Sequence, residues 1–230
     1  MEYIEMQEAR KITSNQEDVH EDLLSYVQKH QTGKSHKPFA KHTTDAFEYV
    51  VEWLEGWHGG VIIDACCGVG ESTLVLAAKY PEARVIGVDK SAARLDKHAY
   101  YKSRHADADA VNAIVIQADL HDFWRLLAAK LDTETPWAVK KQYLLYPNPY
   151  PKKSQLGKRW HASDALPSML SVCNKIEVRS NWSIYVREFA IALAKYGLDM
   201  HVEEHKARPI TPFERKYQDS GQRCWRGVSA

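Results

Sequence analysis

Short apolar runs alternate with amphipathic stretches along most of the chain. Seven runs have the composition of strands: Val61–Ala65, Arg84–Asp89, Ala113–Ala118, Gln142–Tyr146, Lys175–Arg179, Met200–His205 and Arg223–Ser229. Apolar residues recur at helical spacing over Glu71–Lys79, Ala92–Arg104, His121–Leu131 and Trp182–Lys195. Strands that alternate with helices indicate an α/β fold whose mostly parallel sheet carries helices on both faces.

The first part of the chain has a different pattern. We expect residues 1–58 to form a helical N-terminal segment and residues 59–230 to form one α/β domain. Helical periodicity is present at Gln16–Lys29 and again at Thr44–Trp57. The stretch between them is polar, basic and broken by glycine and proline, so we expect a lid over a ligand. The lid would include Lys37, Pro38 and Phe39.

Composition narrows the class of protein. The 230 residues are 44% apolar and carry a formal net charge of +1, so bulk charge does not indicate a nucleic-acid-binding protein. The four cysteines form no Cys-x-x-Cys pair, and we interpret them as inert residues of a cytoplasmic protein. No apolar run reaches the roughly 20 residues that span a bilayer. We predict neither a membrane segment nor a metal site.

A glycine-containing turn follows the first predicted strand. Its sequence, Asp64-Ala65-Cys66-Cys67-Gly68-Val69-Gly70, lacks the G-x-G-x-x-G pattern of dinucleotide-binding turns. Glycines between a strand and a helix let a ligand approach the backbone, and an acidic residue there suits a cationic amino group. S-adenosylmethionine has such a group. We predict that Asp64, Cys66, Gly68 and Gly70 bind it; a tight turn without a ligand is the alternative.

Two more aspartates end the next two predicted strands. Asp89 lies about 20 residues beyond the glycine turn, the spacing at which a carboxylate meets ribose hydroxyls. Asp119 ends the third strand, where it could accept from an adenine amino group or cap the following helix. The carboxyl ends of parallel strands share one edge, so we assign both aspartates and their neighbours Lys90 and Leu120 to the cofactor site.

The fourth predicted strand leads into a proline-rich, basic loop. In Pro147-Asn148-Pro149-Tyr150, Asn148 lies where a substrate atom would meet the cofactor, and Tyr150 could stack on a base. No acidic residue occurs from Thr135 to Ser163. We predict that the basic residues after the loop bind a phosphate backbone: Lys152, Lys153, Lys158 and Arg159. A solvated loop stiffened by proline is the alternative.

From Val61 to its end, the chain resembles the bacterial tRNA (guanine-N7-)-methyltransferases. The family's Pro-Asp-Pro-Trp loop is similar to Pro147-Asn148-Pro149-Tyr150, and its Thr-Asp-Trp is similar to Ser180-Asn181-Trp182. Its Thr-x-Phe-Glu-x-Arg segment is similar to Thr211–Arg215, with the arginine one place early. Two family aspartates are replaced by Asn148 and Asn181, the first glycine by Cys66, and a glutamate by Asp89.

The resemblance implies a Rossmann-like class I fold with a seven-stranded sheet, S-adenosylmethionine as the methyl donor and tRNA as the substrate. It implies that Asn148, Asn181 and Glu214 hold the guanine edge while Thr211 and Arg215 position the base. Asn148 would also border the cofactor. An amide oxygen can accept one bond from the guanine edge, although it carries no charge. The enzyme would act as a monomer or a homodimer.

Two other functions fit the same residues. Asn-Pro followed by an aromatic residue resembles the Asn-Pro-Pro-Tyr loop of enzymes that methylate exocyclic amines, although the order here is Asn-Pro-Tyr-Pro. The two replaced aspartates are also compatible with a protein that binds the cofactor and tRNA without catalysis. The nucleoside that becomes labelled in a methyl-transfer assay distinguishes the three.

Overall fold

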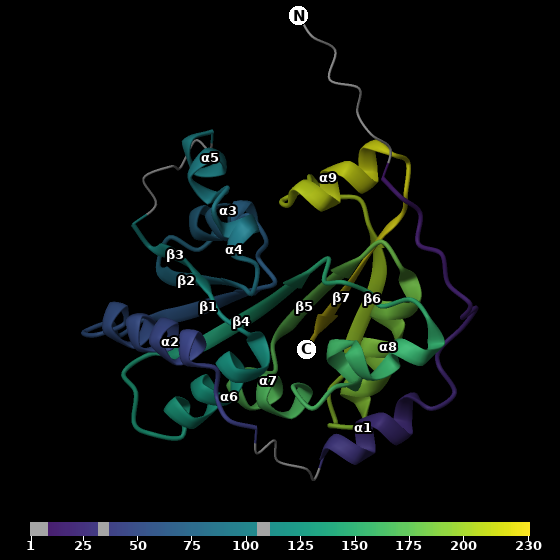
Figure 1. The fold of residues 1–230 in the computed structure, drawn as a ribbon, viewed down its shortest axis with the longest axis horizontal. Helices are drawn as coiled ribbons and strands as arrows, with labels where there is room; N and C mark the ends of the chain where they lie inside the picture. The colour runs from purple at the N-terminus through teal and green to yellow at the C-terminus, as the bar shows by residue number, and fades with distance from the viewer. Residues whose placement is uncertain (1–8, 32–36, 105–110) are drawn as a thin grey trace, which may run out of the picture.

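One mixed sheet of seven strands organises the computed structural model, which describes residues 9–31, 37–104 and 111–230. The sheet order is β3-β2-β1-β4-β5-β7-β6, and β7 runs antiparallel to both neighbours while the other strand pairs are parallel (Figure 1). The strands are β1 (Gly60–Ala65), β2 (Ala83–Asp89), β3 (Ala113–Gln117), β4 (Ala138–Leu145), β5 (Ile176–Ser180), β6 (Met200–His205) and β7 (Cys224–Ser229). This confirms the predicted sheet and all seven strands.

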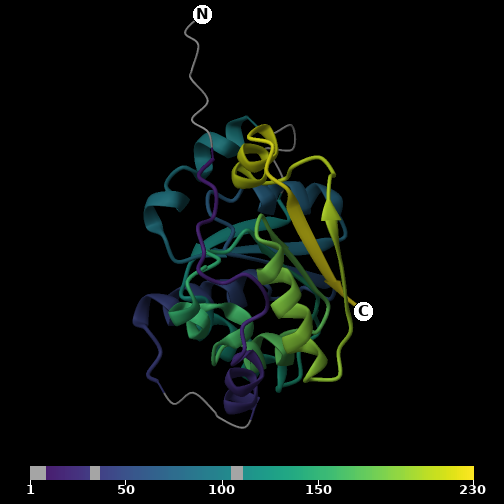
Figure 2. The ribbon, with the colours of Figure 1, turned by 90° about the vertical axis from the view of Figure 1, so that its right-hand side faces the viewer.

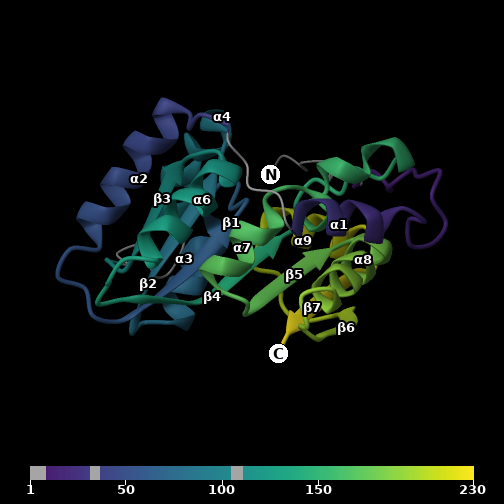
Figure 3. The ribbon, with the colours of Figure 1, turned by 90° about the horizontal axis from the view of Figure 1, so that it is seen from below.

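Helices cover the two faces of the sheet unequally (Figure 3). A large apolar core joins one face to α1 (Leu23–Gln31), α2 (Lys41–Trp53), α6 (Leu120–Leu131), α7 (Leu166–Val172) and α8 (Ser183–Ala194). A smaller core lies on the opposite face beneath α3 (Glu71–Lys79). The remaining helices are α4 (Ala92–Leu95), α5 (His98–Ser103), α9 (Pro212–Asp219) and the 3₁₀ helices η1 (Lys153–Lys158) and η2 (Trp160–Ala162). Residues of the N-terminal segment and of the α/β domain therefore share one core.

On the half of the sheet away from α3, no helix lies over β6 and β7 on the second face (Figure 2), and charged side chains pair across the strands there. Glu177 on β5 accepts a hydrogen bond from Lys141 on β4 at 2.9 Å and from the guanidinium of Arg226 on β7 at 3.1 Å. Arg226 in turn pairs with Glu203 on the edge strand at 2.8 Å. Charged cross-strand pairs of this kind keep an uncovered sheet face compatible with water and discourage edge-to-edge association.

Several helix boundaries differ from the sequence-based expectation. The predicted helix Ala92–Arg104 is split into α4 and α5, and the helix expected over Gln16–Lys29 begins only at Leu23. The sequence pattern did not predict α7 or α9. No helix of the described residues has both the length and the apolarity needed to cross a membrane.

The late start of α1 has its cause in a buried carboxylate on α8. Glu188 Oε1 accepts from the side-chain amide of Gln16 at 2.6 Å and from the backbone N–H of His20 at 2.9 Å. These bonds hold the chain before α1 in an extended path across the domain. The N-terminal segment is therefore fixed by long-range bonds that its own helical periodicity does not encode.

The same carboxylate anchors the segment that follows β4. Its Oε2 accepts from Arg159 at 2.6 Å and from His161 at 3.0 Å, and all three side chains are fully buried. Burial alone raises the pKa of Glu188, but the hydrogen bond from His161 and the charge of Arg159 outweigh it and lower the pKa to about 2. The ionised carboxylate thus joins three separate segments of the chain.

We predict that Glu188→Gln lowers the free energy of unfolding by about 3 kcal/mol at pH 7, because it leaves Arg159 buried without its counter-ion. A depressed carboxylate pKa contributes stability that is fully present above the ordinary value of 4.5 and is lost as the pH falls toward about 2. The difference in unfolding free energy between the variant and the wild type should therefore decrease as the pH falls from 4.5 toward about 2. Urea unfolding between pH 7 and pH 3 measures it.

Glu21→Gln is the matched control, because Glu21 forms an exposed ion pair with Lys153 at 3.0 Å. Its removal should leave the unfolding midpoint unchanged, as expected for a solvated pair. Equal stabilities of the wild type and Glu188→Gln would show that the buried network is not a stabilising anchor.

Candidate active site

The turn between β1 and α3 has an unusual backbone. Cys66, Gly68 and Gly70 have φ angles of 60°, 61° and 75°, in the left-handed region that favours glycine. This geometry explains why the resembling family has glycine where this chain has Cys66. A side chain at Gly68 would meet nothing within 4 Å, so the open side of the turn is accessible to a ligand. The glycine turn is therefore present, with a strained cysteine at its start, and the binding of a cofactor by these residues stays a prediction.

Burial keeps the thiol of Cys66 in its neutral form. Burial, and then the nearby charge of Asp89, raise the pKa of its thiol to about 12. The thiol is therefore neutral at physiological pH, in line with its interpretation as an inert residue.

Asp64 lies underneath the turn and not on its open side. It has no exposed surface, and its Oδ2 accepts from the hydroxyls of Ser72 and Thr73, both at 2.7 Å. Burial raises the pKa of Asp64 to about 6. The predicted direct contact with a cationic ligand is therefore wrong for this geometry, and Asp64 instead positions the turn by tying the first residues of α3 to β1.

Asp89 and Asp119 lie at neighbouring strand ends, as predicted. Asp89 accepts from the backbone N–H groups of Gly68 at 3.0 Å and Ser91 at 2.8 Å, with Arg94 3.6 Å away. The carboxylate thus braces the glycine turn while it lies beside it. Asp119 caps α6 by accepting from the N–H of His121 at 2.9 Å, and Leu120 behind it is buried. Capping was the alternative role considered for Asp119.

The loop after β4 begins beside the glycine turn, because Leu144 pairs with Ala65 across the two strands. Asn148 is exposed, and its Oδ1 accepts from the backbone N–H of Tyr150 at 3.2 Å. Tyr150 has a φ of 47°, a conformation that this bond and a neighbouring arginine maintain. The structure therefore presents the Asn148 amide at the sheet edge where the predicted cofactor residues lie.

Arg159 does not belong to the phosphate-binding set predicted from the sequence. It is fully buried, stacks on Trp182 at 4.8 Å and donates to Glu188 and to the carbonyl of Tyr150. No surface remains for a phosphate, so this prediction is wrong and Arg159 is a structural anchor. Lys152 and Lys158 are exposed, and Lys153 is partly exposed beside Glu21.

Glu214 on α9 is also a structural anchor and not a base-contacting residue. It is fully buried and accepts from Arg179 at 3.0 Å and from the hydroxyl of Tyr146 at 3.0 Å, and His205 Nε2 lies 2.9 Å from its carboxylate. Thr211 is buried and caps α9 by accepting from the N–H of Glu214 at 2.9 Å. Both predicted substrate contacts are therefore wrong, since neither side chain has a free polar group facing solvent.

Arg215 and Asn181 retain exposed surface but have protein partners. Arg215 forms an ion pair with Glu71, the first residue of α3, and so joins α9 to the helix behind the glycine turn. The side-chain amide of Asn181 donates to Gln222 at 3.0 Å. Sequence reasoning missed Glu71 in this role, because nothing local to it indicates a partner 144 positions away.

The predicted lid is only partly within the described residues, since 32–36 lie outside them. Arg125 on α6 donates to the carbonyl of Lys37 at 2.9 Å and stacks on the ring of Phe39 at 4.2 Å. Pro38 lies between them in the chain. This stretch therefore runs against the helix that begins after Asp119, and its covering of a ligand stays a prediction.

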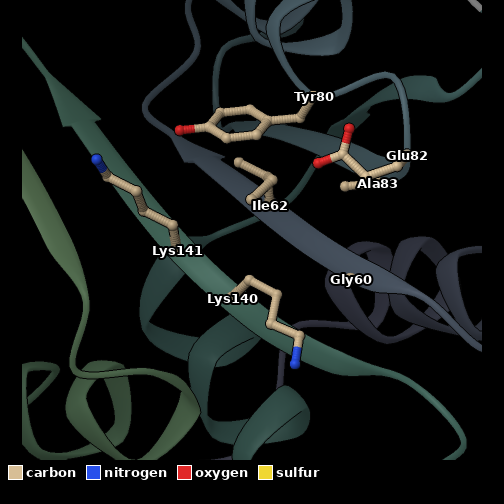
Figure 4. Close-up of a pocket in the computed structure, with 7 residues that line it drawn as sticks. All are labelled: Gly60, Ile62, Tyr80, Glu82, Ala83, Lys140 and Lys141. Carbon is tan, nitrogen blue, oxygen red and sulfur yellow. The ribbon is translucent and has the colours of Figure 1, made fainter.

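A hollow of about 320 Å³ lies at the opposite edge of the sheet (Figure 4). Gly60, Ile62 and Ala83, from the first halves of their strands, line it together with Tyr80, Glu82, Lys140 and Lys141. Lys140 and Lys141 are thus separated from the lysines after β4. Within residues 9–31, 37–104 and 111–230 no cluster of side chains could hold a metal ion.

Comparison with known proteins places this geometry in a family. A family model described as "Putative methyltransferase" matches residues 58–227. The chain is 23% identical over 186 residues to a tRNA (guanine-N(7)-)-methyltransferase of Staphylococcus epidermidis, covering 76% of this chain and 81% of that protein. It is 25% identical over 198 residues to the enzyme of that name from Paracoccus denitrificans, covering 84% and 76%.

Solved structures have the same fold. The 16S rRNA methyltransferase KamB superposes with a TM-score of 0.54 at 18% identity, covering 86% of this chain and 96% of that one. The 16S rRNA (adenine(1408)-N(1))-methyltransferase of Catenulisporales acidiphilia, determined with its cosubstrate, superposes with a TM-score of 0.52 at 14% identity. The match covers 80% of this chain and 89% of that one. These likenesses show a class I methyltransferase fold.

The glycine turn fits the methyl donor of this fold, S-adenosylmethionine. The open space at Gly68 would admit its methionine part, while Asp89 beside the turn and Asp119 at the next strand end keep the predicted ribose and adenine roles as predictions. When bound, the cofactor supplies an electrophilic methyl group. The residues of the chain supply the shape and the hydrogen bonds that hold it.

We predict that Gly68→Ala weakens S-adenosylmethionine binding by at least about tenfold, because the new methyl group occupies the space for the ligand. Gly197→Ala is the matched control. Gly197 has a φ of 72°, lies just after the end of α8, and an added methyl group there would meet nothing within 4 Å. Both variants should lose about 1 kcal/mol of stability from backbone strain.

Isothermal titration calorimetry with thermal unfolding separates the two effects. Only Gly68→Ala should lose affinity. Equal affinities of the two variants would exclude the glycine turn as the cofactor site.

Proposed function

The chain belongs to the methyltransferase family matched over residues 58–227, and we propose that it transfers a methyl group from S-adenosylmethionine to N7 of guanine in tRNA. The observation that carries the proposal is the position of Asn148, exposed at the start of the β4 loop beside the glycine turn. The relatives named above act on this atom of tRNA. The protein would work in the cytoplasm, as a monomer or a homodimer.

Guanine N7 carries a lone pair and needs no proton removed before it attacks the methyl group. The protein therefore has to align N7 with the methyl group and exclude water. The Asn148 side chain can accept one bond from the guanine edge through its amide oxygen, in exchange for the bond it receives from Tyr150. Asn181 offers the same group after β5, where it now pairs with Gln222.

The buried anchors act through the groups they hold. Arg159 donates to the carbonyls of Tyr150 and Lys152, which fixes the loop that presents Asn148. Glu214 accepts from Tyr146 at the root of the same loop. Lys152, Lys153 and Lys158 would bind tRNA phosphates beside it. In this proposal Arg159 and Glu214 are positioning residues and do not touch the base.

The direct test is incubation of the protein with labelled S-adenosylmethionine and unmodified bulk tRNA, followed by identification of the labelled nucleoside. We expect 7-methylguanosine. A labelled exocyclic amine would assign the chain to the second class of methyltransferase. Cofactor and tRNA binding without any label would assign it a non-catalytic role.

We predict that Asn148→Ala lowers kcat by about tenfold or more with S-adenosylmethionine affinity unchanged, the cost of about one hydrogen bond to the base. Asn148→Asp should retain or raise activity, because a carboxylate accepts more strongly from guanine N1–H and N2–H. Asn174→Ala is the matched control, since Asn174 is exposed at the opposite end of β5. Unchanged kcat in Asn148→Ala would contradict the role given to this side chain.

A further inference from the structure

An aromatic row runs from the root of the β4 loop to the surface of α9. Tyr146, the residue after β4, contacts Tyr217 with ring centroids 5.5 Å apart. Tyr217 stacks on Phe213 at 6.3 Å with an angle of 23° between the rings. Phe213 is 44% exposed, so the outer ring of the row is accessible to solvent. The ring of Phe213 is thus held at the helix surface by contact with the rings beneath it.

The orientation of α9 is imposed and does not follow from its own composition. Thr211 caps the helix, and the buried Glu214 fixes which side faces the domain. Phe213 and Tyr217 are four residues apart, so they lie together on another side of the helix. The Thr211 cap and the buried Glu214 therefore fix the position of the aromatic row. The helix α9 lies at the top of the view in Figure 1, opposite α3 and α4.

Exposed basic side chains lie on α9 and on the loop before it. Lys216 lies three residues after Phe213 and hence on the same side of α9, and it is exposed. The loop before the helix carries the exposed Arg208, and Gln218 holds this loop against α9 by donating to the carbonyl of Ala207 at 3.1 Å. Neither Arg208 nor Lys216 forms an ion pair within the part of the chain that the structure describes.

We propose that α9 is a second RNA contact, in which Phe213 stacks on an unpaired nucleobase and Arg208 and Lys216 neutralise the phosphates beside it. An exposed aromatic ring on α9, with exposed cations on the same helix and on the loop before it, matches the two chemical parts of a nucleotide, the base and the phosphate. A protein-docking surface would need a wider apolar patch than one ring. The proposal rests on the proposed function, because it supplies the nucleotide that neighbours the methylated guanine.

The ion pair between Arg215 and Glu71 gives this contact a fixed relation to the cofactor site. It joins α9 to the helix that begins at the glycine turn. A nucleotide on Phe213 would therefore be held in register with the methyl donor, while the lysines after β4 would bind phosphates beside the loop that carries Asn148. Two separated contacts define the direction of an RNA strand, which one contact cannot do.

The test compares Phe213→Leu with Phe213→Trp in the full chain, by binding to unmodified tRNA and to a short single-stranded RNA that contains 2-aminopurine. Phe213→Leu should weaken RNA affinity by about tenfold, as expected for the loss of one stacked base. Phe213→Trp should keep the affinity and quench 2-aminopurine fluorescence. Cofactor affinity and the unfolding midpoint should be unchanged in both.

Tyr49→Leu is the matched control, because Tyr49 is 51% exposed on α2, and it should bind RNA as the wild type does. An unchanged RNA affinity of Phe213→Leu would overturn the proposal. If that variant instead altered self-association, α9 would be a protein interface, which also overturns it. If Phe213→Leu is destabilised, the double variant Arg208→Gln, Lys216→Gln provides the test. A weaker salt dependence of RNA binding than in the wild type would support the proposal, and an unchanged salt dependence would overturn it.

These outcomes are distinct from failure of the proposed function. RNA affinity is measured without methyl transfer. Affinity that depends on Phe213 in a protein that labels no guanine would overturn the proposed reaction and support the contact on α9. If guanine is labelled but RNA affinity does not depend on Phe213, the proposed reaction is supported and the contact on α9 is overturned.

Discussion

The buried ion pair between Glu188 and Arg159 is the constraint on which the substrate side of the molecule depends. Two charges placed in the interior lose their hydration, and this cost is recovered only when all their remaining hydrogen-bonding positions are filled. Here Gln16, His20 and His161 fill those of the carboxylate, and the carbonyls of Tyr150 and Lys152 accept from the guanidinium. The requirement to satisfy one buried pair thereby fixes the N-terminal segment and the β4 loop together.

Glu214 repeats the arrangement on the other side of the sheet edge. It lies between Arg179, His205 and Tyr146, so it joins β5, β6 and the residue after β4 to α9. Arg159 and Glu214 look like ligand contacts in the sequence, because a basic loop surrounds the first and a polar helix the second. Both are buried by partners that are distant in the sequence: Glu188 lies 29 residues from Arg159, and Arg179 lies 35 residues from Glu214. The local sequence pattern therefore could not distinguish a buried structural residue from a residue that contacts a ligand.

The sheet was predictable for the opposite reason. A strand buried on both faces needs a short apolar run, and the glycine turn needs residues that tolerate positive φ, so both requirements are local and visible in the sequence. The helix α9 was missed because its core-facing residue is Glu214, which inverts the usual amphipathic pattern. Likewise, Gln16–Asp22 has helical periodicity but stays non-helical until Leu23, since Gln16 and His20 bond to Glu188. Tertiary hydrogen bonds override local preference at both places.

The two anchors also bear on how an enzyme could use asparagine where its relatives use aspartate. Methylation at N7 leaves the guanine positively charged, and a carboxylate beside it would stabilise that charge more than an amide does. Asp64 is buried beneath the turn, and Asp89 lies 3.6 Å from Arg94, so neither supplies a free negative charge to the base. In the proposed function, selection of the base would then rest on shape, hydrogen-bond geometry and stacking. Such a site requires rigid presentation of the residues proposed to contact RNA, and Arg159 holds the loop of Asn148 while Glu214 holds α9.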